Sequence, residues 1–149
     1  MELEKEILSS KFENNYHKCI VNLVYTYNWT TNSLKKKMSK HQITLQQYNV
    51  LRILRGQHPN PATINMLKER MLDKMSDASR IVDRLIQKGM VTRCTNQTDR
   101  RAVDIIITDK GLNLLKKLDV ELNSADLLKN NLSEEEALQL NNLLDKFRG

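Results

Sequence analysis

Apolar residues recur every three or four positions over most of the chain, which is the spacing of helices with one buried face. Between residues 11 and 38 they form one stripe, which consists of Phe12, Tyr16, Ile20, Leu23, Tyr27, Leu34 and Met38. This pattern predicts a helix of about 28 residues, roughly 42 Å long at ~1.5 Å per residue. Because that length exceeds the diameter of a small domain, we expect part of this helix to pack on a second subunit. Residues 1–10 are polar and are expected to form a frayed end.

Capping signals predict two shorter helices in the next stretch. Thr44 and Gln47 have the spacing of a capping box, and Gly56 is expected to end the helix that they begin. Pro61 is expected to begin a second helix that continues to about Leu72, because proline suits the first helical position.

The segment from Ser76 to Thr108 predicts a helix followed by two strands. Ser76 is expected to cap the helix and Gly89 to end it. Residues 90–94 and 103–108 are strand-like, and the polar residues 95–101 lie between them. Helix, strand, basic loop and strand is the order of a winged helix, in which the helix enters one DNA groove and the loop reaches the next.

Two further helices are predicted towards the C-terminus. Thr108 is expected to cap a long helix that continues to Ala125. Ser133 and Glu136 form a second capping box, which begins the last helix. These helices carry more leucine than a small winged domain can bury, so we expect a second copy of the chain to cover the excess.

The predicted fold is therefore mainly α with a small β-hairpin wing, in the α+β class. Residues 44–108 are expected to form a winged helix-turn-helix core. Residues 1–38 and 109–149 are expected to be dimerisation helices, all within one domain spanning residues 1–149.

The charge is distributed in a way that supports this division. The net charge is +6. Residues 68–101 contain nine Lys or Arg and five Asp or Glu, whereas residues 119–149 contain three and seven. The basic excess thus lies in the proposed DNA-reading part, and a polyanionic partner is favoured.

The remaining composition argues against several other classes. Cys19 and Cys94 have no metal-type spacing, and neither do the histidines at 17, 41 and 58. We therefore expect no metal, no cofactor and no disulfide, and a reducing, cytoplasmic location. The sequence has no signal-peptide pattern and no apolar run long enough to span a membrane. It also lacks the motifs of an enzyme active site, so an enzyme is not expected.

Three segments resemble the MarR family of transcriptional regulators, the multiple-antibiotic-resistance type. They are SRIVDRLIQKGMVTR at 79–93, DRR at 99–101 and ITDKG at 107–111, where Ile107 replaces the usual leucine. The closing segment NLSEEEALQLNNLLDKF is also similar to the last helix of the family. The resemblance implies an obligate homodimer that binds a pseudo-palindromic operator, usually as a repressor. It also implies release of the DNA when a small phenolic or lipophilic compound enters a cleft between the dimer and wing regions.

Five residues of the predicted recognition helix are candidates for DNA contact: Ser76, Asp77, Ser79, Arg80 and Arg84. Arginine reads guanine O6 and N7 with two hydrogen bonds, and residues at the start of the helix reach base edges first. Ser76 serves equally well as a cap, and Asp77 is better placed for the helix dipole than for cytosine. Arg84 has the alternative of pairing with Asp83 or Asp99.

The wing supplies a second group of candidates. Arg100 and Arg101 are expected to reach the minor groove and phosphates, because narrow minor grooves attract arginine. Asp99 is expected to position the loop. Asn96, Gln97 and Thr98 contact the DNA backbone or form a simple polar turn. Before the recognition helix, Thr63 is expected to act as a cap more than as a phosphate contact.

Two alternatives remain open. In the first, Cys19 senses hydroperoxides, as one branch of the family does with a first-helix cysteine, although a core thiol is the favoured interpretation. In the second, the winged core binds another protein instead of DNA.

In the favoured interpretation, the protein is a regulator that competes with polymerase for promoter DNA. A signal that changes the distance between the two recognition helices of the dimer is expected to release it.

Overall fold

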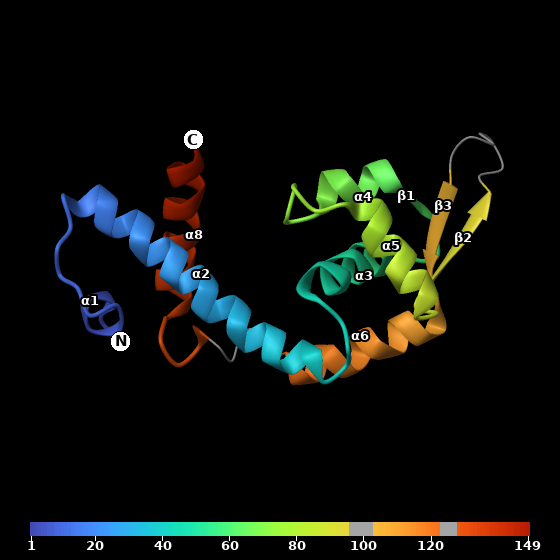
Figure 1. Cartoon of the computed structure of the whole chain (residues 1–149), viewed down its shortest axis with the longest axis horizontal. Coiled ribbons are helices and arrows are strands. Elements are labelled where there is room, and N and C mark those ends of the chain that lie inside the picture. Colours follow the sequence, from blue (N-terminus) through green and yellow to red (C-terminus); the bar gives the residue numbers. More distant parts are fainter. Residues whose placement is uncertain (96–102, 123–127) are drawn as a thin grey trace. The chain divides into compact units, whose positions relative to one another are not determined.

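The computed structural model describes residues 1–95, 103–122 and 128–149, which form two compact units, Met1–Leu115 and Lys116–Gly149. The described residues are mostly helical with one small antiparallel sheet, which confirms the predicted fold class. The helices are α1 (Leu3–Glu6), α2 (Asn15–Ser39), α3 (Leu45–Gln57), α4 (Ile64–Arg70), α5 (Ala78–Gln87), α6 (Asp109–Glu121) and α8 (Glu134–Arg148), and the strands are β1 (Ala62–Thr63), β2 (Val91–Thr95) and β3 (Val103–Ile107) (Figure 1).

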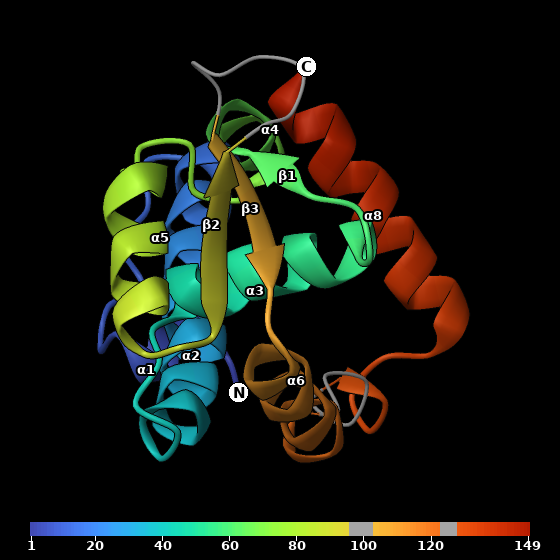
Figure 2. The same cartoon turned by 90° about the vertical axis from the view of Figure 1, so that its right-hand side faces the viewer.

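The sheet has the order β1-β3-β2, so that β3 lies between the other two strands (Figure 2). β2 and β3 pair in antiparallel register from Val91–Ile107 to Thr95–Val103. Ile105 is fully buried and Ile107 nearly so, whereas Val103 at the start of the strand is 43% exposed. The hairpin thereby fixes one face of the sheet on the core.

β1 corrects the prediction that Pro61 begins a helix. Ala62 and Thr63 instead pair with Ile105 and Asp104 of β3, and α4 begins only at Ile64. The Thr63 side chain accepts a hydrogen bond from the Met66 amide at 3.2 Å and caps α4, as expected. The pairing gives the backbone N–H and C=O groups of Ala62 and Thr63 hydrogen-bond partners on β3. In the first turn of a helix that started at Pro61, the N–H groups would have no such partners.

The core of the first unit lies between α3, α4, α5 and the sheet. Helix α3 packs on α5 and β3, and α4 packs on α5. The fully buried side chains include Val50, Leu51, Leu67, Val82, Leu85 and Ile105. At about 25 cal/mol per Å² of buried apolar area, this contact surface is the main source of stability for the winged core.

The end of α3 also differs from the prediction. The helix runs through Gly56 to Gln57 and ends at His58, whose ψ of 133° is extended. The cause is Pro59, because the residue before a proline is excluded from the helical region. The capping box of Thr44 and Gln47 is present, as predicted.

The N-terminal residues do not form a frayed end, because α1 packs against α2. Leu3 is 7% exposed, Lys18 forms an ion pair with Glu4, and the Tyr25 hydroxyl donates to Glu6 at 2.9 Å. The hydrogen bond from Lys18 lowers the pKa of Glu4. Charged and polar contacts from α2 thus order a segment that its composition alone predicted to be loose.

The two predicted C-terminal caps are present. The Thr108 hydroxyl accepts a hydrogen bond from the Gly111 amide at 3.3 Å in the first turn of α6. Ser133 and Glu136 form the predicted capping box of α8, with bonds of 2.8 and 3.2 Å. Ala125, the expected end of the long helix, lies outside the described residues.

Candidate DNA-binding interface

Helices α4 and α5 form a helix-turn-helix whose second helix begins one residue later than predicted. Asp77, not Ser76, caps α5, and its Oδ1 accepts a hydrogen bond from the Arg80 amide at 3.2 Å. Ser76 instead donates its hydroxyl to the Asp73 carboxylate at 2.6 Å. A carboxylate at the cap position also interacts favourably with the positive end of the helix dipole, which explains why Asp77 takes this position.

The two faces of α5 differ sharply in exposure. Ala78, Val82 and Leu85 are fully buried against the rest of the core. The opposite face is polar, because Arg80 and Arg84 are exposed and Ser79 is half-buried. The packing of α5 therefore leaves two arginines, one turn apart, free to face a polyanion.

An ion pair connects α5 to β2. The Arg93 guanidinium lies 2.7 Å from the Asp83 carboxylate, and both side chains are about half exposed. Arg84 was expected to have the option of pairing with Asp83, but Arg93 takes that carboxylate. Asp99, the other suggested partner of Arg84, lies outside the described residues.

Helix α3 supports the segment that leads into α5. The Asn49 Oδ1 accepts a hydrogen bond from the Leu72 amide at 3.0 Å. The Asp73 carboxylate accepts from the Ser76 hydroxyl, from the Met75 amide at 3.1 Å and from the Gln46 side chain. The bond from Ser76, followed by that from Met75, lowers the pKa of Asp73. Sequence patterns did not identify Asn49 or Gln46, although both are polar residues on a helix with an apolar inner face.

The C-terminal end of α5 is held by the first turn of α6. Gly89 has a φ of +68°, which confirms its predicted place just after the helix. The Thr108 hydroxyl donates to the Gly89 carbonyl at 2.8 Å, and the Lys110 ammonium donates to the Lys88 carbonyl at 2.7 Å. These bonds satisfy carbonyls that the end of a helix leaves without partners.

Gly111 allows this close approach. A Cβ atom at this position would lie 2.6 Å from the Met90 carbonyl oxygen and 2.7 Å from the Ile107 Cγ1. Both distances are shorter than real Cβ contacts, so only glycine fits without a backbone shift. The residues Thr108, Lys110 and Gly111 of the ITDKG segment therefore act together to join α6 to the end of α5.

A shallow groove of ≈310 Å³ lies between the beginnings of α3 and α5. Its lining residues are Thr44, Gln46, Gln47, Ser76, Asp77, Arg80, Ile81 and Arg84. The two candidate arginines are therefore close to the same concave surface. The predicted wing residues Asn96, Gln97, Thr98, Asp99, Arg100 and Arg101 lie outside the described residues.

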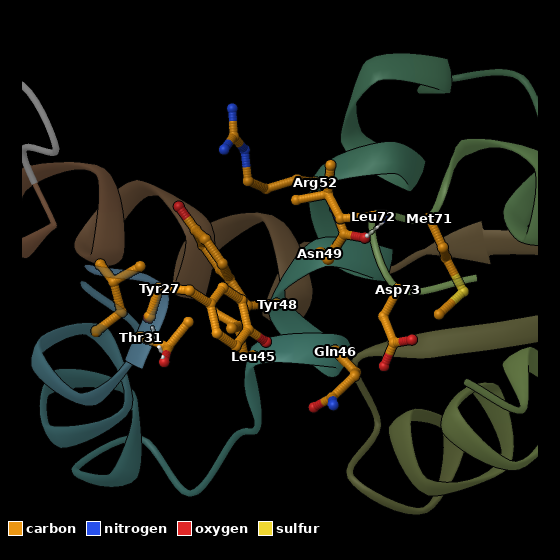
Figure 3. A pocket seen from close by; sticks show the side chains of 11 residues that line it. Tyr27, Thr31, Leu45, Gln46, Tyr48, Asn49, Arg52, Met71, Leu72 and Asp73 are labelled. Carbon is orange, nitrogen blue, oxygen red and sulfur yellow. Dashed lines mark hydrogen bonds between the residues drawn. The ribbon is translucent and has the colours of Figure 1, made fainter. Parts of the chain in front are cut away.

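A larger pocket of ≈460 Å³ lies between α2, α3 and the segment before α5 (Figure 3). Its lining residues are Tyr27, Thr31, Leu34, Leu45, Gln46, Tyr48, Asn49, Arg52, Met71, Leu72 and Asp73. The Arg52 guanidinium lies 5.8 Å from the centre of the Tyr48 ring, within the range of a cation–π contact. The pocket is in the size range of small-molecule sites and combines aromatic walls with a few polar groups.

Of the two cysteines, one lies where it was expected and the other does not. Cys94 lies in β2, as predicted, but Cys19 is exposed on α2 and is not a core thiol within one chain. Its exposed apolar neighbours on α2, such as Ile20 and Leu23, lie on the stripe that was expected to pack partly on a second subunit. Within the described ranges, no group of three or more His, Cys, Asp or Glu is arranged to hold a metal ion. No helix in those ranges is long and apolar enough to cross a membrane.

A helix-turn-helix with a β-hairpin after its second helix defines a winged helix-turn-helix protein. The family model described as MarR family matches residues 41–102. The chain is 30% identical to the HTH-type transcriptional regulator PecS of Dickeya dadantii, over 76% of this chain and 70% of that protein. The chain belongs to the MarR family of transcriptional regulators.

Solved structures agree with this assignment. A mutant of the E. coli MarR protein complexed with operator DNA is 27% identical, with a TM-score of 0.73 and coverage of 99% of each chain. An organohalide-sensing transcriptional regulator in its 2,4-dichlorophenol-bound form has a TM-score of 0.79, covering 93% of this chain and 85% of that one. The identity to the latter is 17%, so this likeness concerns the fold.

Proposed function

We propose that the protein is a homodimeric repressor that binds a pseudo-palindromic operator and acts by occupancy, without catalysis. Each subunit places α5 in the major groove and the wing loop, residues 95–101, in the adjacent minor groove. The observation that carries this proposal is the exposed arginine-bearing face of α5 within a helix-turn-helix. The related E. coli protein, which was solved with operator DNA, supports the same mode of binding.

The residues of α5 divide between contact and support. Arg80 lies in the first turn and reads base edges, because this end of a recognition helix reaches the bases first. Arg84, one turn later, and the half-buried Ser79 contact phosphates or sugars. Ser76 and Asp77 support the start of the helix through the hydrogen bonds described above.

The wing assignments come from the sequence. Arg100 and Arg101 enter the minor groove or bind phosphates, and Asp99 positions the loop. Asn96 and Gln97 contact the DNA backbone. Thr63 is chiefly the cap of α4 and at most an additional phosphate contact.

The DNA-binding assignment is tested by titrating a fragment from upstream of the protein's own gene at two salt concentrations. Arg101→Ala should weaken binding to all sequences and lower the salt slope by about 1, the signature of a lost phosphate contact. Arg80→Ala should relax base preference, at a cost of about 1–3 kcal/mol in discrimination. Arg148→Ala, which removes an arginine ion-paired with Asp145 on α8, is the control. Equal affinity for unrelated DNA would contradict a sequence-specific regulator.

Dimerisation is supported by the exposed apolar face of α2. Tyr16, Ile20, Val24 and Tyr27 are between 53% and 83% exposed in the single chain. Such a face is costly in water, and we propose that a second copy covers it together with the C-terminal helices. Ile20→Glu should therefore dissociate the dimer in sedimentation experiments and abolish binding to paired half-sites. A dimer that persists in this variant would contradict the placement of the interface on α2.

The releasing signal, we propose, is a small aromatic compound that binds in the ≈460 Å³ pocket. Tyr27 and Tyr48 offer ring contacts, and Arg52 offers a positive charge for a phenolate or carboxylate group. We choose 2,4-dichlorophenol as the probe because a structural neighbour binds it. Tyr48→Ala should lower its affinity in calorimetry, whereas Tyr25→Ala, on a tyrosine outside the pocket whose hydroxyl donates to Glu6, should not. Equal affinity in both variants would contradict this site.

A further inference from the structure

The wall of the pocket contains the same residues that hold the segment leading into α5. Asn49, Gln46 and Asp73 line the pocket, and all three form the hydrogen bonds that fix residues 72–76 (Figure 3). The bond from the Leu72 amide to the Asn49 Oδ1 is drawn at the edge of this cavity. Groups that position the recognition helix are therefore within reach of a compound in the pocket.

The segment between α4 and α5 depends on these polar contacts more than on apolar packing. Met71 and Ala78, at its two ends, are buried. Between them, the side chains of Leu72 and Met75 are 87% and 95% exposed and give little packing energy. The hydrogen bonds from α3 therefore determine where the segment lies and where the cap residue Asp77 begins α5.

We propose that Asn49 is the positioning residue through which occupancy of the pocket moves the start of α5. This inference rests on the proposed function, because it names how the ligand acts on DNA binding. In this structure, the Asn49 Oδ1 accepts a hydrogen bond from the Leu72 amide at 3.0 Å. When a ligand fills the pocket, its donor takes Oδ1 or its bulk displaces the Asn49 side chain, and in either case the Leu72 amide loses this acceptor.

The size of the coupling follows from the difference between these two states. A ligand shifts an equilibrium only by its differential affinity for the two conformations. One neutral hydrogen bond has a net effect of about fivefold to tenfold on an equilibrium. We therefore expect a filled pocket to weaken DNA binding by about fivefold to tenfold through Asn49, and each dimer has two such sites.

The first experiment measures amide exchange in the full chain without any ligand. Asn49→Ala removes the acceptor and should speed exchange at Leu72 by about tenfold. Asn49→Asp keeps an acceptor at this position and should retain most of the protection. Asn113→Ala, the same change at an exposed position on α6, is the control. Unchanged protection at Leu72 in Asn49→Ala overturns the proposal.

The second experiment fills the pocket covalently, so that it does not depend on knowing the natural ligand. Leu34 lines the pocket from α2, and Leu34→Cys in a Cys19→Ser, Cys94→Ser background places a single thiol there. Benzyl methanethiosulfonate then attaches a benzyl group to that thiol. Labelling should weaken DNA binding by about fivefold or more and should increase exchange at Leu72. With Asn49→Ala added, labelling should change DNA affinity by less than about twofold.

The outcomes separate this inference from the proposed function. If labelling leaves DNA binding unchanged, the pocket is not coupled to α5 and the inference fails, while operator binding stands. If labelling weakens binding equally with and without Asn49→Ala, the pocket regulates the protein but Asn49 is not the residue that transmits the change. If the unlabelled chain has no preferred DNA, the proposed function fails, and amide exchange still decides whether Asn49 holds the segment.

Discussion

The two ends of the recognition helix α5 are held by different kinds of contact. At the C-terminal end, the first turn of α6 packs so closely that Gly111 faces the Met90 carbonyl with no room for a Cβ atom. At the N-terminal end, side chains of α3 hold a segment whose own apolar side chains are exposed. Close backbone packing resists displacement, whereas single hydrogen bonds are exchanged for others at low cost. The C-terminal end is therefore the fixed end, and a signal that moves α5 has to act at its beginning.

The position of the pocket fits this difference between the two ends of α5. A cavity beside the fixed end would have to break core packing to change the position of α5. The ≈460 Å³ pocket instead lies beside the N-terminal end of α5, which we call the adjustable end. Asn49, Leu72 and Asp73 belong both to the pocket wall and to the contacts at this end. The ligand that we propose for this pocket would therefore contact the hydrogen-bonded groups at the beginning of α5.

The largest expected effect is at the fixed end. Gly111→Ala should lower the free energy of unfolding by about 1–3 kcal/mol, because the new methyl group forces backbone atoms apart. Urea unfolding followed by circular dichroism measures the change. Gly56→Ala is a matched control, since nothing lies within 4 Å of a Cβ at Gly56 in α3. That variant should instead stabilise the protein by up to about 1 kcal/mol. Equal stability of Gly111→Ala and the wild type would show that this end is not tightly packed.

The next effect concerns the cap of α5 at the adjustable end. Asp77→Ala should cost about 1 kcal/mol of stability, because the Arg80 amide loses its acceptor. Asp77→Ser keeps an acceptor oxygen and should lie within a few tenths of a kcal/mol of the wild type. Because it also removes a negative charge near the DNA, Asp77→Ser should bind DNA at least as tightly. If Asp77→Ser weakens operator binding selectively, the carboxylate reads a base and is more than a cap.

The elements on either side of these ends were predictable to different degrees. The capping boxes at Thr44 and Ser133 and the αL glycine at Gly89 are local patterns, and the structure confirms each. The misplaced cap at Ser76 arose because two adjacent residues are both good N-caps. Which of the two caps the helix depends on Asp73, because its carboxylate accepts the Ser76 hydroxyl and leaves the cap position to Asp77.

The contacts that position α5 were not predictable, because they join residues far apart in the chain. Asn49 and Leu72 are 23 residues apart, and Lys110 and Lys88 are 22 residues apart. Strand β1 was missed for the same reason, since a two-residue strand has no periodicity of its own. The apolar stripe of α2 was recognised, and its exposure in one chain agrees with the expected partner subunit without testing it.

A smaller effect is expected for the ion pair between Asp83 and Arg93, which braces the side of α5 against β2. Both side chains are about half exposed, so solvent screens the interaction. A double-mutant cycle with Asp83→Ala and Arg93→Ala should give a coupling of about 0.2–1 kcal/mol that falls at high salt. The Asp145–Arg148 pair within α8 serves as a comparison for a local pair. A coupling free energy well above this range would mean that the ion pair also holds the middle of α5 firmly in place.

The smallest effect is a pH dependence confined to the adjustable end. Hydrogen bonds from Ser76 and Met75 hold the pKa of Asp73 below its ordinary value, so the folded turn favours the carboxylate. Its contribution is complete above the unfolded pKa, about pH 4, and is lost as the pH falls through the lower folded pKa. The amides of Met75 and Ser76 should therefore lose protection only in acid, while those near Gly89 keep it.

Ser76→Ala sharpens this test, because it removes the largest cause of the shift. The carboxyl titration of Asp73, followed by NMR, should move upward towards the ordinary value, and the acid loss of protection should move with it. Ser79→Ala leaves the bonds to Asp73 in place and should leave the titration unchanged. If the amides at both ends of α5 lose protection together as the pH falls, the two ends are not independent and the distinction between a fixed and an adjustable end is wrong.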